Sequence, residues 1–574
     1  MSSVSSVQLG VEIPYGDPHA LSVSLPTWQD NVAWVSGNEG MFNLMSTGYP
    51  RFFVHRMILQ LADIILQKTN VTGRLSHLFP TAYAAHEEVA YLKRYAPTHA
   101  ADFDVKVAIV PLDDASRTLA GRESLEVYAV TFPLSLKKLG KSFWQHVGVG
   151  ITSRYAEICL ANINHPDARF DSLTHFPYPI KPVVVLHPEV VLVTQTLQAR
   201  IASLAFSGKS PEAGHEPNLL ARTNGHDKNK PVDSDVFLYP SGMSSIWHAH
   251  QLIMALKPGL KFVSFGFPYT DTIKVLEKWG PGCIFYGQHP DDNLLELEAF
   301  LKTTQTRIAA LFCECPSNPL LQSPNLPILR ELADKYDFLI VIDDTIGTFV
   351  NVNVLQYVDI VTTSLSKLFS GRANVLGGSM VLNPDFKYYS ALKSLLASSY
   401  RNDFFLPDLI QMEENSRDFE TRVHAVDTNT QAVCHYLRTH SLSHNPSPSC
   451  PLAIKNVFYP EWITRENYDL SRRPGHTNNF GHLFSLTFVS LEASQAFYDA
   501  LQCAKGPSLG TNFTLCCPYT LLAHWWEREW AAEFGVEEGI VKVSVGMESV
   551  DVLTKWFEDA VRAAESTVDT DIAV

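Results

Sequence analysis

The sequence lacks any block of positive charge. Its 45 Lys and Arg residues are outnumbered by 60 Asp and Glu residues, which gives a net charge of −15. Because nucleic-acid binding needs clustered cationic side chains that neutralise phosphates, we exclude nucleic acid as the main partner. An apolar run of the ~20 residues that a membrane helix requires is also missing, so we expect no membrane span. The N-terminus has neither the basic nor the apolar region of a secretory signal, so we expect a cytoplasmic protein.

Cysteine is scarce and irregularly spaced. The nine cysteines show no repeated spacing, and neither Cys313 with Cys315 nor Cys516 with Cys517 forms the paired C-x-x-C frame of a zinc site. We therefore expect reduced, buried thiols and no metal. The hydrophobic content of 46% and the charged content of 18% are typical of a globular protein. A chain of 574 residues is too long for one hydrophobic core, so several domains are expected.

Composition and periodicity divide the chain into four parts. Residues 1–80 are expected to form an N-terminal arm followed by a helix. Residues 81–231 form an insertion region that ends in a polar linker over 208–232, which is rich in Gly, Pro and Asn. Residues 232–396 are expected to form a large domain, and residues 397–574 a smaller C-terminal α+β domain.

After residue 232, short apolar strands alternate with helical segments. This pattern predicts an α/β fold with a mostly parallel sheet that helices cover on both faces. In such sheets, ligands bind at the carboxyl ends of the strands, so the residues that follow each strand are candidates for chemistry. The expected strands lie at 236–239, 261–265, 283–286, 308–313, 338–342 and 358–362.

The first expected strand ends in Ser241, Gly242 and Met243, which open a helix. Backbone N–H groups at a helix N-terminus form an anion site that suits a phosphate. The alternative is an ordinary helix cap at Ser241.

Three further strand ends carry candidate residues. Tyr269 follows the second strand, and its aromatic ring is suited to stacking on a planar cofactor, although it could equally be a core aromatic. Asn318 lies in a turn, or donates a hydrogen bond to a ring substituent. Asp343 ends a buried apolar strand, where a carboxylate is costly unless paired; a protonated ring nitrogen is a suitable partner, and a helix cap is the alternative.

The segment 359–378 contains one lysine, Lys367, close to the end of an expected strand. Burial lowers the pKa of a lysine and makes its amine a nucleophile that can form a Schiff base with an aldehyde cofactor. The alternative is a surface lysine. Ser364 and Ser366 add hydroxyl donors for a phosphate. With the other strand ends, this segment supplies the parts that a pyridoxal phosphate site requires.

These residues resemble the motifs of the Cys/Met-metabolism family of fold type I pyridoxal-phosphate enzymes, and most closely its long fungal cystathionine γ-synthase branch. The resemblance implies an aspartate aminotransferase-like fold and an enzyme. It covers roughly residues 232–564. The matching motifs, in order, are Ser241-Gly242-Met243, Glu314-Cys315-Pro316-Ser317-Asn318-Pro319, Asp343-Asp344-Thr345, Ser364-Leu365-Ser366-Lys367, Pro507-Ser508-Leu509-Gly510 and Lys542-Val543-Ser544-Val545-Gly546.

The resemblance implies residue roles beyond those read from the strand ends. Tyr49 and Arg51 are similar to a Tyr-x-Arg motif that binds the cofactor phosphate of a neighbouring subunit, which implies a homodimer or homotetramer. Ser508, Lys542 and Arg372 are the implied substrate-binding residues. Lys367, Tyr269 and Asp343 are the implied catalytic residues. The implied reaction is γ-replacement on an O-acyl-L-homoserine, with cysteine as the small nucleophile that gives cystathionine.

Three positions depart from the family pattern. Lys542 stands where most members have an arginine that binds the substrate carboxylate, and lysine lacks the bidentate fork. Arg372 and Asn374 replace a histidine and an aspartate. These departures leave other activities open: γ-substitution with sulfide or with a carbon nucleophile such as a β-keto acid, cleavage of a C–S bond by a lyase, or an inactive homologue.

Overall fold

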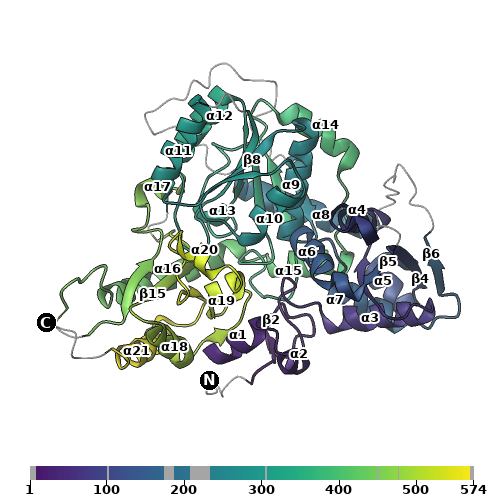
Figure 1. Ribbon diagram of the computed structural model, residues 1–574, viewed down its shortest axis with the longest axis horizontal. Coiled ribbons are helices and arrows are strands. Elements are labelled where there is room, and N and C mark those ends of the chain that lie inside the picture. The colour runs from purple at the N-terminus through teal and green to yellow at the C-terminus, as the bar shows by residue number, and fades with distance from the viewer. Residues whose placement is uncertain are drawn as a thin grey trace.

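The structure, a computed structural model, describes residues 8–99, 102–173, 187–206, 233–303, 307–448, 451–475 and 478–568. The linker expected over 208–232 lies outside the described residues. Three larger sheets organise the described chain: one in the large domain, one in the C-terminal domain and one in a unit inserted near the N-terminus (Figure 1). A fourth sheet, of two short strands, lies in the N-terminal arm.

The sheet of the large domain contains seven described strands in the order β7-β13-β12-β11-β10-β8-β9. Neighbouring strands from β9 to β12 run parallel, whereas β13 is antiparallel to both of its neighbours. The mostly parallel sheet expected from the sequence is confirmed. Its strands are β7 (Val236–Tyr239), β8 (Lys261–Phe265), β9 (Cys283–Tyr286), β10 (Ile308–Glu314), β11 (Leu339–Asp343), β12 (Ile360–Ser364) and β13 (Gly378–Leu382).

Helices cover both faces of this sheet because its strands are apolar on both sides. In β11, Val341 packs in a cluster with α9, α10 and α14, while Ile340 and Ile342 pack in a cluster with α8, α11, α12 and α13. These helices are α8 (Pro188–Ala205), α9 (Gly242–Leu256), α10 (Thr270–Lys278), α11 (Pro290–Thr303), α12 (Leu326–Tyr336), α13 (Thr348–Asn351) and α14 (Tyr389–Ser399).

The C-terminal domain has its own five-stranded sheet in the order β14-β15-β18-β17-β16. Strand β17 reads Leu-Cys-Cys-Pro and is too short to show a period in the sequence. The elements are α15 (Leu406–Asn415), α16 (Phe419–Thr439), β14 (Ile454–Phe458), α17 (Arg465–Asp469), β15 (Leu483–Phe488), α18 (Leu491–Ala500), β16 (Ala504–Lys505), β17 (Leu515–Pro518), α19 (Tyr519–His524), α20 (Arg528–Ala532), β18 (Val541–Ser544) and α21 (Val550–Glu565).

The inserted unit is a four-stranded antiparallel sheet, β3-β5-β4-β6, packed against helices. Leu61 and Ile65 of α3 share one apolar core with Ala108 of β4 and Val127 of β5. The expected boundary at residue 80 therefore falls inside this unit. Its elements are α3 (Arg56–Lys68), β3 (Arg74–Phe79), α4 (Ala82–Tyr95), β4 (Asp104–Pro111), α5 (Asp114–Ala120), β5 (Ser124–Pro133), α6 (Lys137–Val147), α7 (Ser153–Asn162) and β6 (Arg169–Ser172).

The described part of the N-terminal arm is folded onto its own chain and is not extended. Its elements are β1 (Glu12–Ile13), β2 (Ser22–Val23), α1 (Trp28–Val35) and α2 (Glu39–Leu44). A capping box between Thr27 and Asp30 starts α1. The backbone N–H of Trp28 donates to Asp499 at 2.7 Å, and Asn31 donates to the Tyr498 hydroxyl at 3.0 Å, so α1 is bound to α18 of the same chain.

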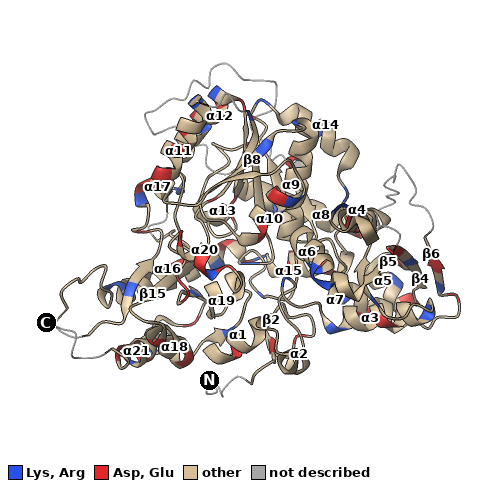
Figure 2. Ribbon diagram, viewed as in Figure 1, with Lys and Arg blue, Asp and Glu red and all other residues tan. Residues whose placement is uncertain are grey.

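Charge and hydrophobicity are distributed as in an ordinary globular protein. Basic and acidic residues are interspersed over the described chain (Figure 2). Within the described ranges, none of the helices has both the length and the apolar character needed to cross a membrane. The eight cysteines in these ranges are free thiols.

Candidate active site

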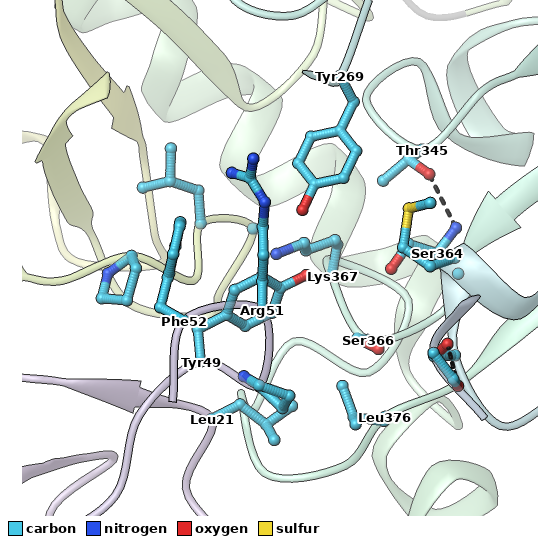
Figure 3. Close-up of a pocket in the computed structure, with 18 of the residues that line it drawn as sticks. Leu21, Tyr49, Arg51, Phe52, Tyr269, Thr345, Ser364, Ser366, Lys367 and Leu376 are labelled. Atoms are coloured by element: carbon cyan, nitrogen blue, oxygen red, sulfur yellow. Dashed lines mark hydrogen bonds between the residues drawn. The ribbon is translucent and has the colours of Figure 1, made fainter. Parts of the chain in front are cut away.

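A cavity of ≈ 220 Å³ lies where the carboxyl ends of the large sheet meet the other parts of the chain. Its walls come from the strand ends, the small domain, the N-terminal segment and the inserted unit. Figure 3 shows Lys367, Tyr49, Arg51 and Tyr269 converging inside it. The side chains expected at the strand ends are therefore brought together in one place.

Lys367 follows strand β12 and lines the cavity. Its Nζ lies 4.2 Å from the centre of the Tyr49 ring. The loop of the small domain approaches Lys367 closely at Gly510, where a Cβ would lie 3.0 Å from the Lys367 Cβ and where φ is +87°. A larger residue at 510 would therefore displace the lysine or the loop.

Two carboxyl groups lie side by side at the ends of β10 and β11. Glu314 and Asp343 are register partners, and burial raises the pKa of both, to about 8 for Glu314. The two oxygens of Glu314 accept from the backbone N–H of Tyr269 at 2.6 Å and from that of Asn318 at 2.9 Å. Asp343 lines the cavity, whereas Asp344 is buried and accepts from the Thr363 hydroxyl at 2.5 Å. Asp343 is thus the carboxyl available to a ligand.

The expected phosphate motif opens α9. The Ser241 hydroxyl caps this helix by accepting from the Ser244 N–H at 3.1 Å, and it donates to the Gly148 carbonyl at 2.8 Å. The N–H groups of Gly242 and Met243 come first in the helix and have no intrahelical acceptor. A Cβ on Gly242 would lie 2.7 Å from the Ser364 Cβ, so only glycine lets the helix start this close to Ser364.

Ser366 lines the cavity, but its hydroxyl is already engaged. It accepts from the N–H of Gly377 at 2.9 Å, which fixes the loop that follows Lys367. Ser364 donates its backbone N–H to the Thr345 hydroxyl at 2.8 Å. The Ser364 hydroxyl, next to the start of α9, is therefore the better placed of the two for an anion.

Tyr49 and Arg51 line the cavity of their own chain. The resemblance implied instead that they contribute to the site of a neighbouring subunit. The Arg51 guanidinium is paired with Asp271 (Nε to Oδ2, 2.6 Å) and lies 5.1 Å from the centre of the Tyr269 ring. The segment is held here because its own chain anchors it: Arg56, at the start of α3, donates to the Met45 carbonyl at 2.7 Å.

Lys542 is a second lysine in the same cavity, and unlike Lys367 it is buried. It projects from β18 of the small domain and donates to the Asn318 side-chain carbonyl. Burial lowers its pKa to about 8, an effect that Cys517 opposes and Lys367 increases. The small domain thus places one titratable cation opposite the strand ends.

Two of the expected substrate-binding residues do not reach the cavity. Arg372 is exposed and is absent from the lining, because it directly follows the turn at Gly371, where φ is +71°. Ser508 is buried behind the wall that Pro507 and Leu509 form, and its hydroxyl has no partner among the described residues. Neither side chain lines the cavity in this structure, so direct substrate contact by these two residues stays a prediction.

The structure explains the asparagine at position 374. Its side chain donates to Asp17 at 2.8 Å and accepts from Asn415 at 2.8 Å. An aspartate here would set two carboxylates against each other, since Asp17 needs a donor. Asn374 therefore joins the N-terminal segment to helix α15 at the rim of the cavity.

Sequence reasoning missed the contribution of the inserted unit. Its segment from Trp144 to Arg154 lines one wall of the cavity, and Gln145 donates to Asp271 at 3.1 Å. The glycines at 148 and 150 were the only local signal, and glycines alone do not indicate a ligand site. No cluster of metal-ligating side chains occurs in the described ranges.

Two family models match the chain. The model described as "Cys/Met metabolism PLP-dependent enzyme" matches residues 233–562, and the model described as "Fungal trans-sulfuration enzyme, N-terminal domain" matches residues 57–152. The second match falls on the inserted unit. The chain therefore belongs to the Cys/Met-metabolism family of pyridoxal-phosphate-dependent enzymes, as its motifs indicated.

Several relatives are similar over almost the whole chain. The chain is 42% identical to "Cystathionine gamma-synthase-like enzyme iboG2" of Amanita muscaria, over 98% of this chain and 97% of the relative. It is 36% identical to "Cystathionine gamma-synthase" of Neurospora crassa, over 97% and 98%. It is also 31% identical to "Alanine racemase ungC" of Aspergillus violaceofuscus, over 97% of each. The protein is thus a cystathionine γ-synthase-like enzyme, and the expected fold class and pyridoxal phosphate cofactor are confirmed.

The contact between Gly148 and Ser241 yields a first prediction. In Gly148→Ala, the new Cβ would lie 2.3 Å from the Ser241 Oγ, so the start of α9 must shift. We expect binding of pyridoxal phosphate to weaken roughly tenfold, the equivalent of one hydrogen bond. Absorbance titration of the apoenzyme measures this.

Gly73→Ala is the matched control. Gly73 has φ of +68°, close to the +65° of Gly148, but no atom lies within 4 Å of its added Cβ. Both variants carry the same backbone strain, so both should unfold at a lower temperature. If Gly73→Ala weakened cofactor binding as much as Gly148→Ala, the contact with Ser241 would have no part in it.

Proposed function

We propose that this enzyme catalyses γ-replacement on an O-acyl-L-homoserine, with cysteine as the nucleophile and cystathionine as the product. The observation that carries the proposal is the presence of two lysines in one cavity, the half-buried Lys367 beside the strand ends and the buried Lys542 on the small domain. One amine is needed for the cofactor, and a separate cation is needed for the carboxylate of an amino-acid substrate.

The residues of the cavity fit pyridoxal phosphate. The unpaired N–H groups of Gly242 and Met243, with the Ser364 hydroxyl, would hold the phosphate. Tyr269 would cover the ring, Asn318 would bond to its substituent, and the buried Asp343 would pair with the ring nitrogen. When bound, the cofactor supplies an electron sink that stabilises negative charge at the substrate Cα.

The remaining cofactor contacts come from the N-terminal segment and the lysine loop. Tyr49 would lie beside the reactive amine of Lys367. Arg51, which lies over the Tyr269 ring, would keep that ring in place against the cofactor. The hydroxyl of Ser366 would fix the loop behind the phosphate. These assignments rest on the positions of the side chains in the cavity.

Lys367 is the group that moves protons in this proposal. Its Nζ would take a proton from Cα of the substrate and move a proton from Cβ, while Lys542 holds the carboxylate. The Cγ–O bond breaks, with its electron pair leaving on the acyl carboxylate. The sulfur of the nucleophile supplies the pair of the new C–S bond, and the thiol proton is released, so that atoms and electrons balance.

The oligomeric state and the location are inferred from family membership alone. Enzymes of this family act on amino acids and are typically oligomeric. We infer a homodimer or homotetramer that acts in the cytoplasm, for which membership of the family is the support. Light scattering of the purified protein measures the assembly.

The identity of the nucleophile is tested by product analysis. The holoenzyme is incubated with O-acetylhomoserine and, separately, with cysteine, sulfide or acetoacetate, and products are identified by mass. We expect cystathionine to form faster than the other products. A preference for sulfide or acetoacetate, a C–S bond cleaved without replacement, or racemisation alone would each contradict the proposal.

The second lysine predicts a pH dependence. Because the pKa of Lys542 is lowered to about 8, its cation is lost as the pH rises above 8. Binding of a carboxylate should weaken, so the KM for O-acetylhomoserine should rise about tenfold per pH unit above that value.

Lys542→Arg is the matched variant, because arginine stays protonated throughout this range. Its KM for O-acetylhomoserine should stay nearly constant between pH 7.5 and roughly 9.5. Because titration of the substrate affects both proteins equally, it cancels in the ratio of the wild-type KM to the KM of Lys542→Arg. Parallel KM profiles for the two proteins would remove Lys542 from carboxylate binding.

A further inference from the structure

The proposed reaction requires two carboxylates to be bound, one on the amino-acid substrate and one on the cysteine nucleophile. This inference rests on the proposed function. Four cationic side chains line the cavity: Arg51, Arg154, Lys367 and Lys542. The lining histidines, His55 and His482, are neutral near pH 7 because burial lowers the pKa of each.

Three of these four cations already have a partner or a role in the proposed reaction. Arg51 is paired with Asp271 through two hydrogen bonds, of 2.6 and 3.3 Å. Lys367 serves the cofactor, and Lys542 serves the carboxylate of the first substrate. Arg154 of the inserted unit is left, and the family pattern of residues 232–564 does not include it.

The guanidinium of Arg154 is buried and oriented. Its Nη1 donates to the Asn374 carbonyl at 2.7 Å and to Asp408 at 3.1 Å. Asp408 is fixed in turn by the Thr152 hydroxyl at 2.6 Å. The Nη2 atom has one long contact, 3.5 Å to Gln411, and the described residues offer the guanidinium no other acceptor. Of its five N–H donors, some are therefore left for a ligand.

We propose that Arg154 binds the carboxylate of the nucleophile, so that the inserted unit selects a nucleophile that carries a carboxylate. The Asn374 carbonyl ties the guanidinium to the loop that begins at Lys367, and both Arg154 and Lys367 line the same cavity. The planar guanidinium matches the geometry of a carboxylate. Since Asp408 balances its charge, the affinity comes from oriented hydrogen bonds, and the expected effect is about tenfold.

The test compares two nucleophiles in one protein. Cysteine carries a carboxylate and sulfide does not, so only cysteine should depend on Arg154. In Arg154→Gln holoenzyme, we expect the KM for cysteine to rise about tenfold, with the KM for sulfide and for O-acetylhomoserine unchanged. Arg154→Lys keeps the charge but loses the bidentate geometry of the guanidinium, so its KM for cysteine should lie between those of the wild type and of Arg154→Gln.

A second variant separates binding from folding. Arg154→Gln leaves Asp408 as an unpaired buried carboxylate, which destabilises a protein. The double variant Arg154→Gln/Asp408→Asn removes that carboxylate and should keep the selective loss for cysteine. Equal losses for cysteine and sulfide, or an unchanged KM for cysteine, would overturn the role of Arg154. A wild-type enzyme that does not use cysteine would overturn the proposed function itself.

Discussion

Glu314 and Asp343 lie next to each other at the ends of two parallel strands, and both carboxyl groups are buried. Buried carboxyls are costly unless they are paired or hydrogen-bonded. Glu314 meets this cost by accepting two backbone N–H groups, which fixes Tyr269 and Asn318. Asp343 accepts from the backbone N–H of Thr345 at 2.9 Å and also lines the cavity, where we propose that it would pair with the ring nitrogen of the cofactor. The rest of the site is arranged around this pair.

The inserted unit is part of the site as well as an addition to the fold. Its α6–α7 connection contacts the start of α9 through Gly148, and it holds Asp271 through Gln145. Arg154 links it to the lysine loop. This unit matches the N-terminal domain of fungal trans-sulfuration enzymes. The match agrees with the observation that the unit supplies one wall of the cavity, in addition to the walls from the large and small domains.

Much of the fold and of the cofactor site could be predicted from the sequence, because both depend on local signals. Strands of a parallel sheet are apolar runs, and the residues after them meet at one edge, so the order of residues along the chain is enough to place Ser241, Tyr269, Asn318, Asp343 and Lys367 together. The two positions that do not line the cavity depend on the course of the backbone: Arg372 is turned outward by the left-handed Gly371, and Ser508 lies behind its neighbours.

The contacts of the inserted unit could not be predicted for a different reason. Arg154 is separated from Asn374 by 220 residues, and no period or motif in the sequence reports a contact at that distance. The same holds for the N-terminal segment, whose composition resembles an extended arm although α1 is bound to α18. Local composition describes flexibility in isolation, whereas these segments are ordered by tertiary contacts.

The central claim is that Lys367, and not the nearby Lys542, carries the cofactor. The most direct measurement is borohydride reduction of the holoenzyme, followed by proteolysis and mass spectrometry of the peptides. We predict a covalent pyridoxyl group on Lys367 alone, with the peptide that contains Lys542 unmodified. A pyridoxyl group on Lys542, or on neither lysine, would contradict the account.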